Sequence, residues 1–341
     1  MYLKECPWLD ASIKELPTAL PGALLIHGQR GTGKQHLARS LCQSQLCETP
    51  SGAGLPCGHC EGCHLFEVGN HPDFRHLRPA KDEAENATDT ANGGATTKKP
   101  SSIIGIDSVR ELTSLTSVAA HRSGTKVVMI TPAEALHPSA ANALLKMLEE
   151  PGRDTCFILV TNDIKRILPT IRSRCFLLHV KTPSGDIDMD WLQANDPQRA
   201  KVALALSSNA PFAARDLIVD ENFWAGRESL MARLSDDSTS PVDIAGAAES
   251  LEPAVLGRLL NMWVFDLLVL QQGGKVRFNV DIERELVRLS STVSGPDLCR
   301  WSDDVQRFFR SAEHPLNRRL ALESLFASWP GSSQRLLKVA P

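Results

Sequence analysis

The sequence lacks the long apolar runs and the excess of positive charge that mark several large classes of protein. No apolar run approaches the ~20 residues of a membrane-spanning helix, and the first residues carry no signal-peptide stretch. The formal net charge of −3 disfavours a strongly electrostatic nucleic-acid binder, although it leaves room for a local basic face. We therefore expect a cytoplasmic protein with no membrane attachment.

Composition is otherwise that of a globular protein. The 341 residues are 42% hydrophobic and 23% charged, which is enough apolar material for two or three domains with cores of their own. Nine cysteines, an odd number without an export signal, favour thiols and metal ligands over disulfides.

A glycine-rich segment at residues 28–35 has the frame of a phosphate-binding loop, in which backbone N–H groups, a helix N-terminus and a lysine hold phosphates. Its candidate phosphate-binding residues are Gly28, Gly31, Gly33 and Lys34. Gln35, however, stands where a Ser or Thr hydroxyl would hold Mg²⁺. The loop therefore predicts at most phosphate or nucleotide binding, or merely a tight strand-to-helix turn.

The acidic partner of such a loop is also missing. An ATPase of this kind needs an acid at the end of a neighbouring strand, but the predicted strand Lys126–Ile130 ends in Thr131-Pro132. Glu134 lies past the strand end and out of phase with it. Mg²⁺ binding and ATP hydrolysis are thus not expected, and ATP binding is doubtful.

Four cysteines lie close together after the first predicted helix: Cys47, Cys57, Cys60 and Cys63. Overlapping C-x-x-C steps with glycine turns bring thiolates to one tetrahedral ion, and four sulfurs leave no open position, so we predict structural Zn²⁺. Cys42 is the main rival fourth ligand and His59 a weaker one. Unmetallated thiols or an iron–sulfur cluster are the alternatives.

Strands and helices alternate in the first half of the chain, which predicts a parallel sheet covered on both faces. The low-complexity stretch 80–102 is interpreted as a disordered surface insertion. After Pro183 the pattern becomes wholly helical. The predicted strands are 23–27, 126–130, 156–160 and 176–180, and the main predicted helices are 139–150, 189–193, 197–207, 211–219, 224–234, 253–272, 282–290, 297–311 and 316–328.

An arginine is presented just before the last strand, within Ser173-Arg174-Cys175. At such a sheet edge, Arg174 can reach a γ-phosphate on a neighbouring subunit, a contact that contributes about 10³–10⁵ in rate where it occurs. The alternative is a surface salt bridge, which spacing alone does not exclude.

Several segments together resemble the delta-prime subunit family of the bacterial DNA polymerase III clamp loader. They are the four-cysteine insertion, His71-Pro72-Asp73, Ile106 to Leu112, Ala140 to Pro151 (Ala-Ala-Asn-Ala-Leu-Leu-Lys-Met-Leu-Glu-Glu-Pro), and Ile171 to Cys175. The resemblance spans nearly the whole chain and weakens in the insertion and in the last ~110 residues.

The resemblance implies three domains: a RecA-like AAA+ domain with the zinc module 47–63 (1–182), a helical lid (183–220) and a helical collar for oligomerisation (221–341). It also implies a non-hydrolysing subunit without a polymerase site, within the polymerase holoenzyme. Partners would be the gamma or tau motor subunits and the delta subunit, with the sliding clamp and primed DNA reached through the complex. Arg174 would act in trans as an arginine finger.

Two further positions follow from the resemblance. Thr161-Asn162 falls at the first sensor, and Phe212 replaces the second-sensor arginine, with Arg215 three residues too late. The rival hypotheses are an active AAA+ motor subunit and a zinc-dependent DNA-binding module. Three basic side chains would face DNA or stay solvated helix charges: Arg110, Arg122 and Lys146.

Overall fold

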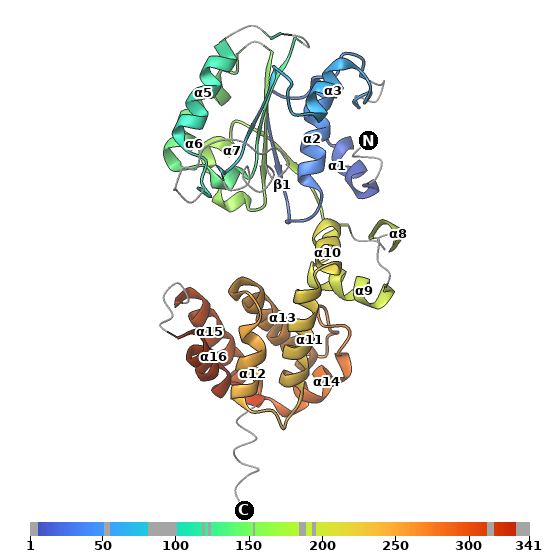
Figure 1. Ribbon diagram of the computed structural model, residues 1–341, viewed down its shortest axis with the longest axis vertical. Helices are drawn as coiled ribbons and strands as arrows, with labels where there is room; N and C mark the ends of the chain where they lie inside the picture. Colours follow the sequence, from blue (N-terminus) through green and yellow to red (C-terminus); the bar gives the residue numbers. More distant parts are fainter. Residues whose placement is uncertain are drawn as a thin grey trace, which may run out of the picture. The chain divides into compact units, whose positions relative to one another are not determined.

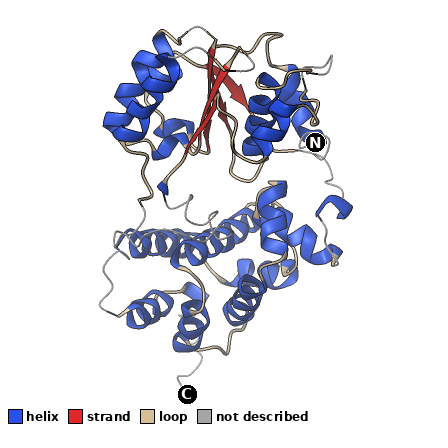
Figure 2. Cartoon of the chain, turned by 45° about the horizontal axis from the view of Figure 1, so that its top comes forward, coloured by secondary structure: helices blue, strands red, loops and turns tan. Residues whose placement is uncertain are grey.

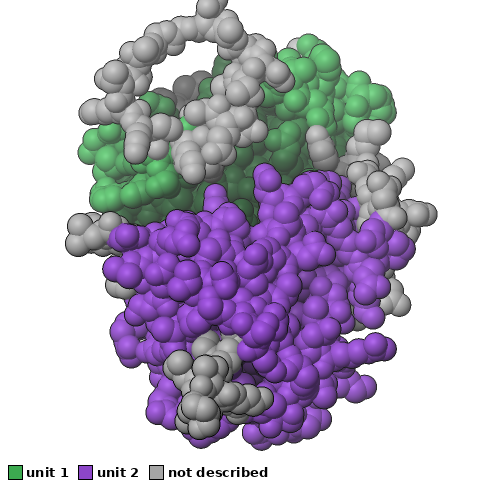
Figure 3. Space-filling view, turned by 60° about the horizontal axis from the view of Figure 1, so that its bottom comes forward, with its two compact units in different colours: residues 1–185 green, residues 186–341 purple. Residues whose placement is uncertain are grey.

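The chain divides into two compact units, residues 1–185 and 186–341 (Figure 3). The computed structural model describes residues 6–50, 55–80, 101–117, 120–121, 124–152, 154–183, 189–192, 196–311 and 317–331. Most of the predicted insertion 80–102 therefore lies outside the described residues, as does Arg122. Each unit is described below by itself.

The first unit is built on a five-stranded sheet in which all neighbouring strands are parallel. Its order is β2-β3-β4-β1-β5, so β1 lies inside the sheet and β5 at one edge. The strands are β1 (Ala23–His27), β2 (Phe74–Leu77), β3 (Lys126–Ile130), β4 (Thr155–Thr161) and β5 (Phe176–His179). The carboxyl ends of β1, β3 and β4 meet along one edge, where ligands of parallel sheets bind.

Helices cover both faces of this sheet, in the layered arrangement that parallel sheets require (Figures 1 and 2). One side carries α1 (Asp10–Lys14), α2 (Lys34–Gln45) and α3 (Glu61–Glu67), and the other carries α5 (Ile106–Ser117), α6 (Pro138–Glu149) and α7 (Pro169–Arg172). Short 3₁₀ turns are η1 (Pro7–Leu9), η2 (Ala133–Ala135) and η3 (Ile164–Arg166).

Alternating side chains of the strands form the core against α5, α6 and α7. Leu25, Val128 and Phe157 point to this face and are buried. Leu144 and Leu148 of α6, one helical turn apart, pack against them. Pro138 occupies the first position of α6, where a missing N–H costs nothing, and Pro151 stops the helix from continuing past Glu150.

The second unit is entirely helical among its described residues. The helices are α8 (Met189–Leu192), α9 (Pro197–Leu206), α10 (Pro211–Ile218), α11 (Glu221–Ser235), α12 (Pro241–Glu249), α13 (Pro253–Gln271), α14 (Glu283–Thr292), α15 (Gly295–Ser311) and α16 (Arg318–Ala327). The predicted class, an α/β sheet domain followed by helices, is confirmed. A small apolar cluster joins α8, α9 and α10, and a larger one joins the later helices. The division into lid and collar stays a prediction.

Helix α13 corrects one statement made from the sequence. Its 19 residues, with a mean hydropathy of 1.5, are by length and composition enough to cross a membrane, and it is the one such helix among the described residues. Leu256, Leu260, Trp263 and Leu267 of this helix are buried in the larger apolar cluster. Because Asp266 is also buried among protein donors, we interpret α13 as the central helix of this unit's core.

Asp266 organises the loop that follows α13. Its carboxylate accepts hydrogen bonds from the backbone N–H groups of Arg277 (2.9 Å), Phe278 (3.2 Å) and Asn279 (2.8 Å), and from the Asn279 amide (2.9 Å). Arg227 in turn donates to Asn279 (3.1 Å) and binds Asp281 through both terminal nitrogens. These bonds satisfy a buried charge, so they fix the loop to the helix core.

Asp266→Ala should lower the free energy of unfolding of this unit by about 2–4 kcal/mol, because three backbone N–H groups lose their buried acceptor. Tryptophan fluorescence in urea measures it, since only Trp8 of the six tryptophans lies in the other unit. Asp303→Ala, at an exposed position of α15, is the matched control. Equal stability of the two variants would contradict this role.

Candidate functional site

The glycine-rich loop connects the buried strand β1 to α2, as predicted. Gly31 and Gly33 adopt left-handed φ values of 82° and 92°, and Gly33 is the N-cap of α2. A Cβ at Gly28 would lie 2.3 Å from the carbonyl oxygen of Val180, so only glycine fits there. The loop therefore has the backbone of a phosphate cradle at a helix N-terminus.

The loop is closed by hydrogen bonds of its own. Lys34 is only 4% exposed, and its Nζ donates to the carbonyl oxygen of Gln29 at 2.6 Å. Thr32 donates to the same carbonyl (2.9 Å), and the Trp8 indole donates to the carbonyl of Thr32 (3.0 Å). To bind a phosphate, the Lys34 ammonium would have to give up its hydrogen bond to the carbonyl oxygen of Gln29.

Burial leaves the Lys34 ammonium poorly solvated. It lowers the pKa of Lys34 to about 8, with Arg30 acting in the same direction and Glu134 opposing it. A buried lysine without a full counter-charge favours its neutral form. The same desolvation would strengthen its attraction to an anion, so the chemistry of the cradle fits a phosphate group.

The position expected to hold an acid at the end of β3 is taken by a neutral pair. The Thr131 hydroxyl lies 2.6 Å from Nε2 of His76 on the neighbouring strand. Burial, helped by Arg78 and Arg39, lowers the pKa of His76 to about 4, so this imidazole is neutral at pH 7. Gln35 is exposed and offers no anionic oxygen. The donor set at these positions does not fit Mg²⁺.

Glu134 makes contacts that its position in the sequence did not predict. The turn η2 folds back, and Glu134 Oε1 accepts from the backbone N–H of Asn162 (3.1 Å) and from its amide (3.3 Å). Its charge also raises the pKa of Lys34. Glu134 thus lies past the end of β3, as expected, in the 3₁₀ turn that follows the strand. A spacing rule for strands cannot find such a contact.

The four predicted cysteine ligands do come together. Their sulfur atoms lie within 4.8 Å of one another, with Cys47 to Cys60 at 3.8 Å and Cys57 to Cys63 at 3.9 Å. Tetrahedral zinc with Zn–S bonds of about 2.3 Å requires sulfur separations of about 3.8 Å. The donor set and its spacing therefore fit a four-sulfur metal site.

Hydrogen bonds within the cluster favour thiolates. The backbone N–H groups of Cys57, Cys60 and Cys63 donate to the sulfurs of Cys47, Cys57 and Cys60, at 3.3, 3.3 and 3.4 Å. The Thr49 side chain, followed by the His59 N–H, lowers the pKa of Cys57 to about 5, whereas burial raises the pKa of both Cys47 and Cys63. A metal binds the deprotonated sulfurs.

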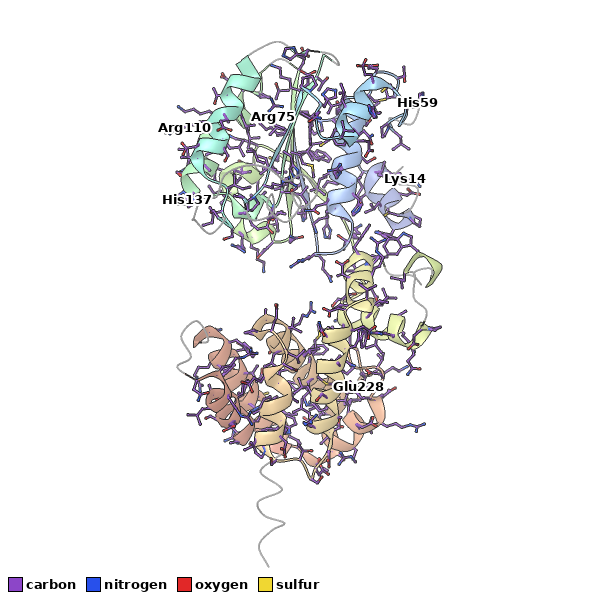
Figure 4. The ribbon with its side chains drawn as sticks, in the orientation of Figure 1. Lys14, His59, Arg75, Arg110, His137 and Glu228 are labelled. Atoms are coloured by element: carbon purple, nitrogen blue, oxygen red, sulfur yellow. The ribbon has the colours of Figure 1, made fainter. Side chains whose placement is uncertain are left out.

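The two rival ligands lie elsewhere. Cys42 is fully buried, and desolvation followed by the nearby Cys156 raises its pKa well above the usual value. The Nδ1 atom of His59 lies 3.0 Å from the backbone carbonyl oxygen of Cys57, and His59 lies at the outer end of the cysteine segment (Figure 4). Neither belongs to the group of four sulfurs.

Arg174 lies at the surface near the edge strand β5, directly after α7. Its side chain is 34% exposed and forms an ion pair with Glu149, the last residue of α6. It also donates to the carbonyl of Thr170 (3.0 Å) and to the Ser173 hydroxyl (3.4 Å). Cys175 is half-buried, and burial raises its pKa to about 11, so it packs as an apolar side chain.

Two of the other basic residues named from the sequence, Arg215 and Arg110, have local partners. Arg215 lies over the rings of Trp191 (5.0 Å) and Phe212 (5.1 Å). Arg110 projects from the outer side of α5 (Figure 4) and pairs with Asp107 at 3.3 Å. Lys146 is exposed on α6. Contact of Arg110 or Lys146 with DNA stays a prediction.

The known proteins to which this chain is similar belong to one family of DNA polymerase III subunits. The family described as "DNA polymerase III, delta subunit" matches residues 11–184. DNA polymerase III subunit delta' of Escherichia coli (strain K12) is 33% identical over 299 residues, covering 84% of this chain and 83% of that protein. The proteins of the same name from Yersinia pestis (30% identical; 95% and 94% covered) and Pseudomonas aeruginosa (39%; 62% and 60%) also match. The chain belongs to the family of DNA polymerase III delta-prime subunits.

Proposed function

We propose that this chain is a non-hydrolysing clamp-loader subunit that supplies Arg174 to the ATP site of an adjacent gamma or tau motor subunit. Together with a delta subunit, the assembly would open the sliding clamp and place it on primed DNA in the cytoplasm. The observation that carries the proposal is the contrast between an exposed, oriented Arg174 and a phosphate loop whose acidic position is filled by the neutral Thr131–His76 pair.

This contrast favours a subunit that supplies an arginine to a neighbouring ATP site over a subunit that hydrolyses ATP itself. Hydrolysis needs a bound metal and a group that orients water, and neither Gln35 nor Thr131 supplies an anionic ligand. A guanidinium presented at the surface, by contrast, can stabilise charge that develops on a phosphate held by another chain. Three domains, with the second unit divided into a lid (183–220) and a collar (221–341), belong to the same proposal.

We also propose that Cys47, Cys57, Cys60 and Cys63 hold structural Zn²⁺. Four sulfurs at tetrahedral spacing leave no position for substrate, so the ion would stabilise and not catalyse. The site begins two residues after α2 ends. Zinc would thereby fix the far end of the helix that starts at the phosphate loop.

Arg174→Ala should leave assembly with motor and delta subunits intact but slow ATP hydrolysis at the adjoining site by about 10³-fold. Rapid-quench measurement of the reconstituted complex, with clamp and primed DNA, would show the loss of the fast phase from that site. Arg75→Ala is the matched control, because Arg75 is exposed on β2 at the opposite edge of the sheet (Figure 4). An unchanged fast phase in the Arg174 variant would refute the finger role.

Metal analysis of the purified chain should find about one equivalent of zinc. Cys60→Ser should reduce that content several-fold and lower the melting temperature, because one of four sulfur ligands is lost. Cys299→Ser, at an exposed cysteine of α15 in the other unit, should change neither quantity. A metal content of zero in freshly purified chain, or iron in place of zinc, would contradict the assignment.

Any nucleotide binding by the chain should weaken as pH rises through about 8, the pKa of Lys34. Above that pH the lysine is neutral and loses its attraction to phosphate, whereas a solvated lysine keeps its charge to about pH 10. Calorimetric titration with ATP at pH 7, 8 and 9 measures this, with Lys34→Met as the control that should show no such step. Affinity that is constant to pH 9 would show that the ammonium has no part.

A further inference from the structure

The guanidinium of Arg174 is held by acceptors from two separate helices. Nη1 donates to the carbonyl of Thr170 (3.0 Å) and to the hydroxyl of Ser173 (3.4 Å), both at the end of α7. Nη2 donates to Oε1 of Glu149 at the end of α6. Three acceptors around a planar group define its position and its rotation, so the side chain has one orientation in the free chain.

This arrangement leaves part of the guanidinium for another ligand. Arginine has five N–H donors, and the three bonds to Thr170, Ser173 and Glu149 use two on Nη1 and one on Nη2. The Nε–H and the second Nη2–H have no partner among the residues that the structure describes. A phosphate oxygen can accept a charge-assisted hydrogen bond from such a donor.

The stability of the fold does not explain why an acid stands at position 149. A carboxylate at the C-terminus of a helix meets the negative end of the helix dipole, so Glu149 does not help α6. The ion pair is half-exposed, with side-chain exposures of 34% and 48%, and such pairs contribute little to folding. Leu144 and Leu148 bury the preceding turns of α6, so the carboxylate is carried on a rigid support.

We propose that Glu149 is a positioning residue for Arg174. Its carboxylate fixes Nη2 so that the remaining donors are already oriented when the γ-phosphate of the adjacent motor subunit arrives. This inference rests on the proposed finger role of Arg174. It assigns to Glu149 the orientation of the group and no contact with nucleotide. Misplacement of a catalytic group by about 1 Å can cost 10²-fold in rate.

The test uses the reconstituted clamp loader and the rapid-quench assay of the adjoining ATP site. Glu149→Ala should slow hydrolysis there at least about tenfold while ATP binding by the motor subunit and the melting temperature of the variant stay unchanged. Glu149→Gln should restore most of the rate, because the amide oxygen still accepts from Nη2. Glu150→Gln is the matched control, since this neighbouring acid is exposed and has no ion pair among the described residues.

Comparison with Arg174→Ala separates this inference from the finger role itself. If Arg174→Ala has no effect, the proposed function fails. If Arg174→Ala slows ATP hydrolysis at the adjoining site but Glu149→Ala leaves its rate unchanged, only the positioning role is overturned. The double variant should be no slower than Arg174→Ala alone, because Glu149 acts through the arginine. If the two substitutions instead reduce the rate independently, so that their effects multiply in the double variant, the positioning role is also overturned.

Discussion

The packing of α2 against the parallel sheet is the constraint on which both sites of the first unit depend. This helix starts at Lys34 in the phosphate loop and ends at Gln45, two residues before Cys47. Leu37, Ala38 and Leu41 are buried along its length, so neither end can shift without opening the core. The loop and the cysteine cluster are therefore two ends of one rigid element, although they carry unrelated chemistry.

The glycine-rich loop has the scaffold of a phosphate site, and the end of β3 is neutral. Gly28, Gly33 and Lys34 still form a cradle, and Glu134 still brings a carboxylate to Asn162 beside it. At the end of β3, the side chains of Thr131 and His76 form a neutral hydrogen-bonded pair. A neutral hydrogen bond at this buried position avoids the cost of an unpaired acid. The site is thus stable without the cation that an acid would need.

Sequence reasoning found the elements whose signals are local. The buried strands β1, β3 and β4, the helix α6 and the four cysteines follow from apolar periodicity, flanking prolines and C-x-x-C spacing. It missed β2, a short edge strand in which polar side chains interrupt the alternation, and α12, whose small residues give a weak pattern. It did not find the contact of Glu134 with Asn162 or that of Glu149 with Arg174, because both depend on how distant segments fold together. The role proposed for Arg174 rests on the whole motif and stays a prediction, since an exposed arginine has no spacing of its own.

Two arginine–carboxylate pairs in this chain differ in burial and therefore in their contribution to stability. Arg227 is 3% exposed and binds Asp281 through two nitrogens (2.7 and 2.8 Å), so removing either partner would leave a buried charge alone. Arg174 binds Glu149 through one nitrogen at a half-exposed position. Water screens the second pair, and its net energy is small. Under the proposed finger role, Arg174 needs a partner that orients it without holding it too tightly, and of these two pairs the half-exposed one meets that condition.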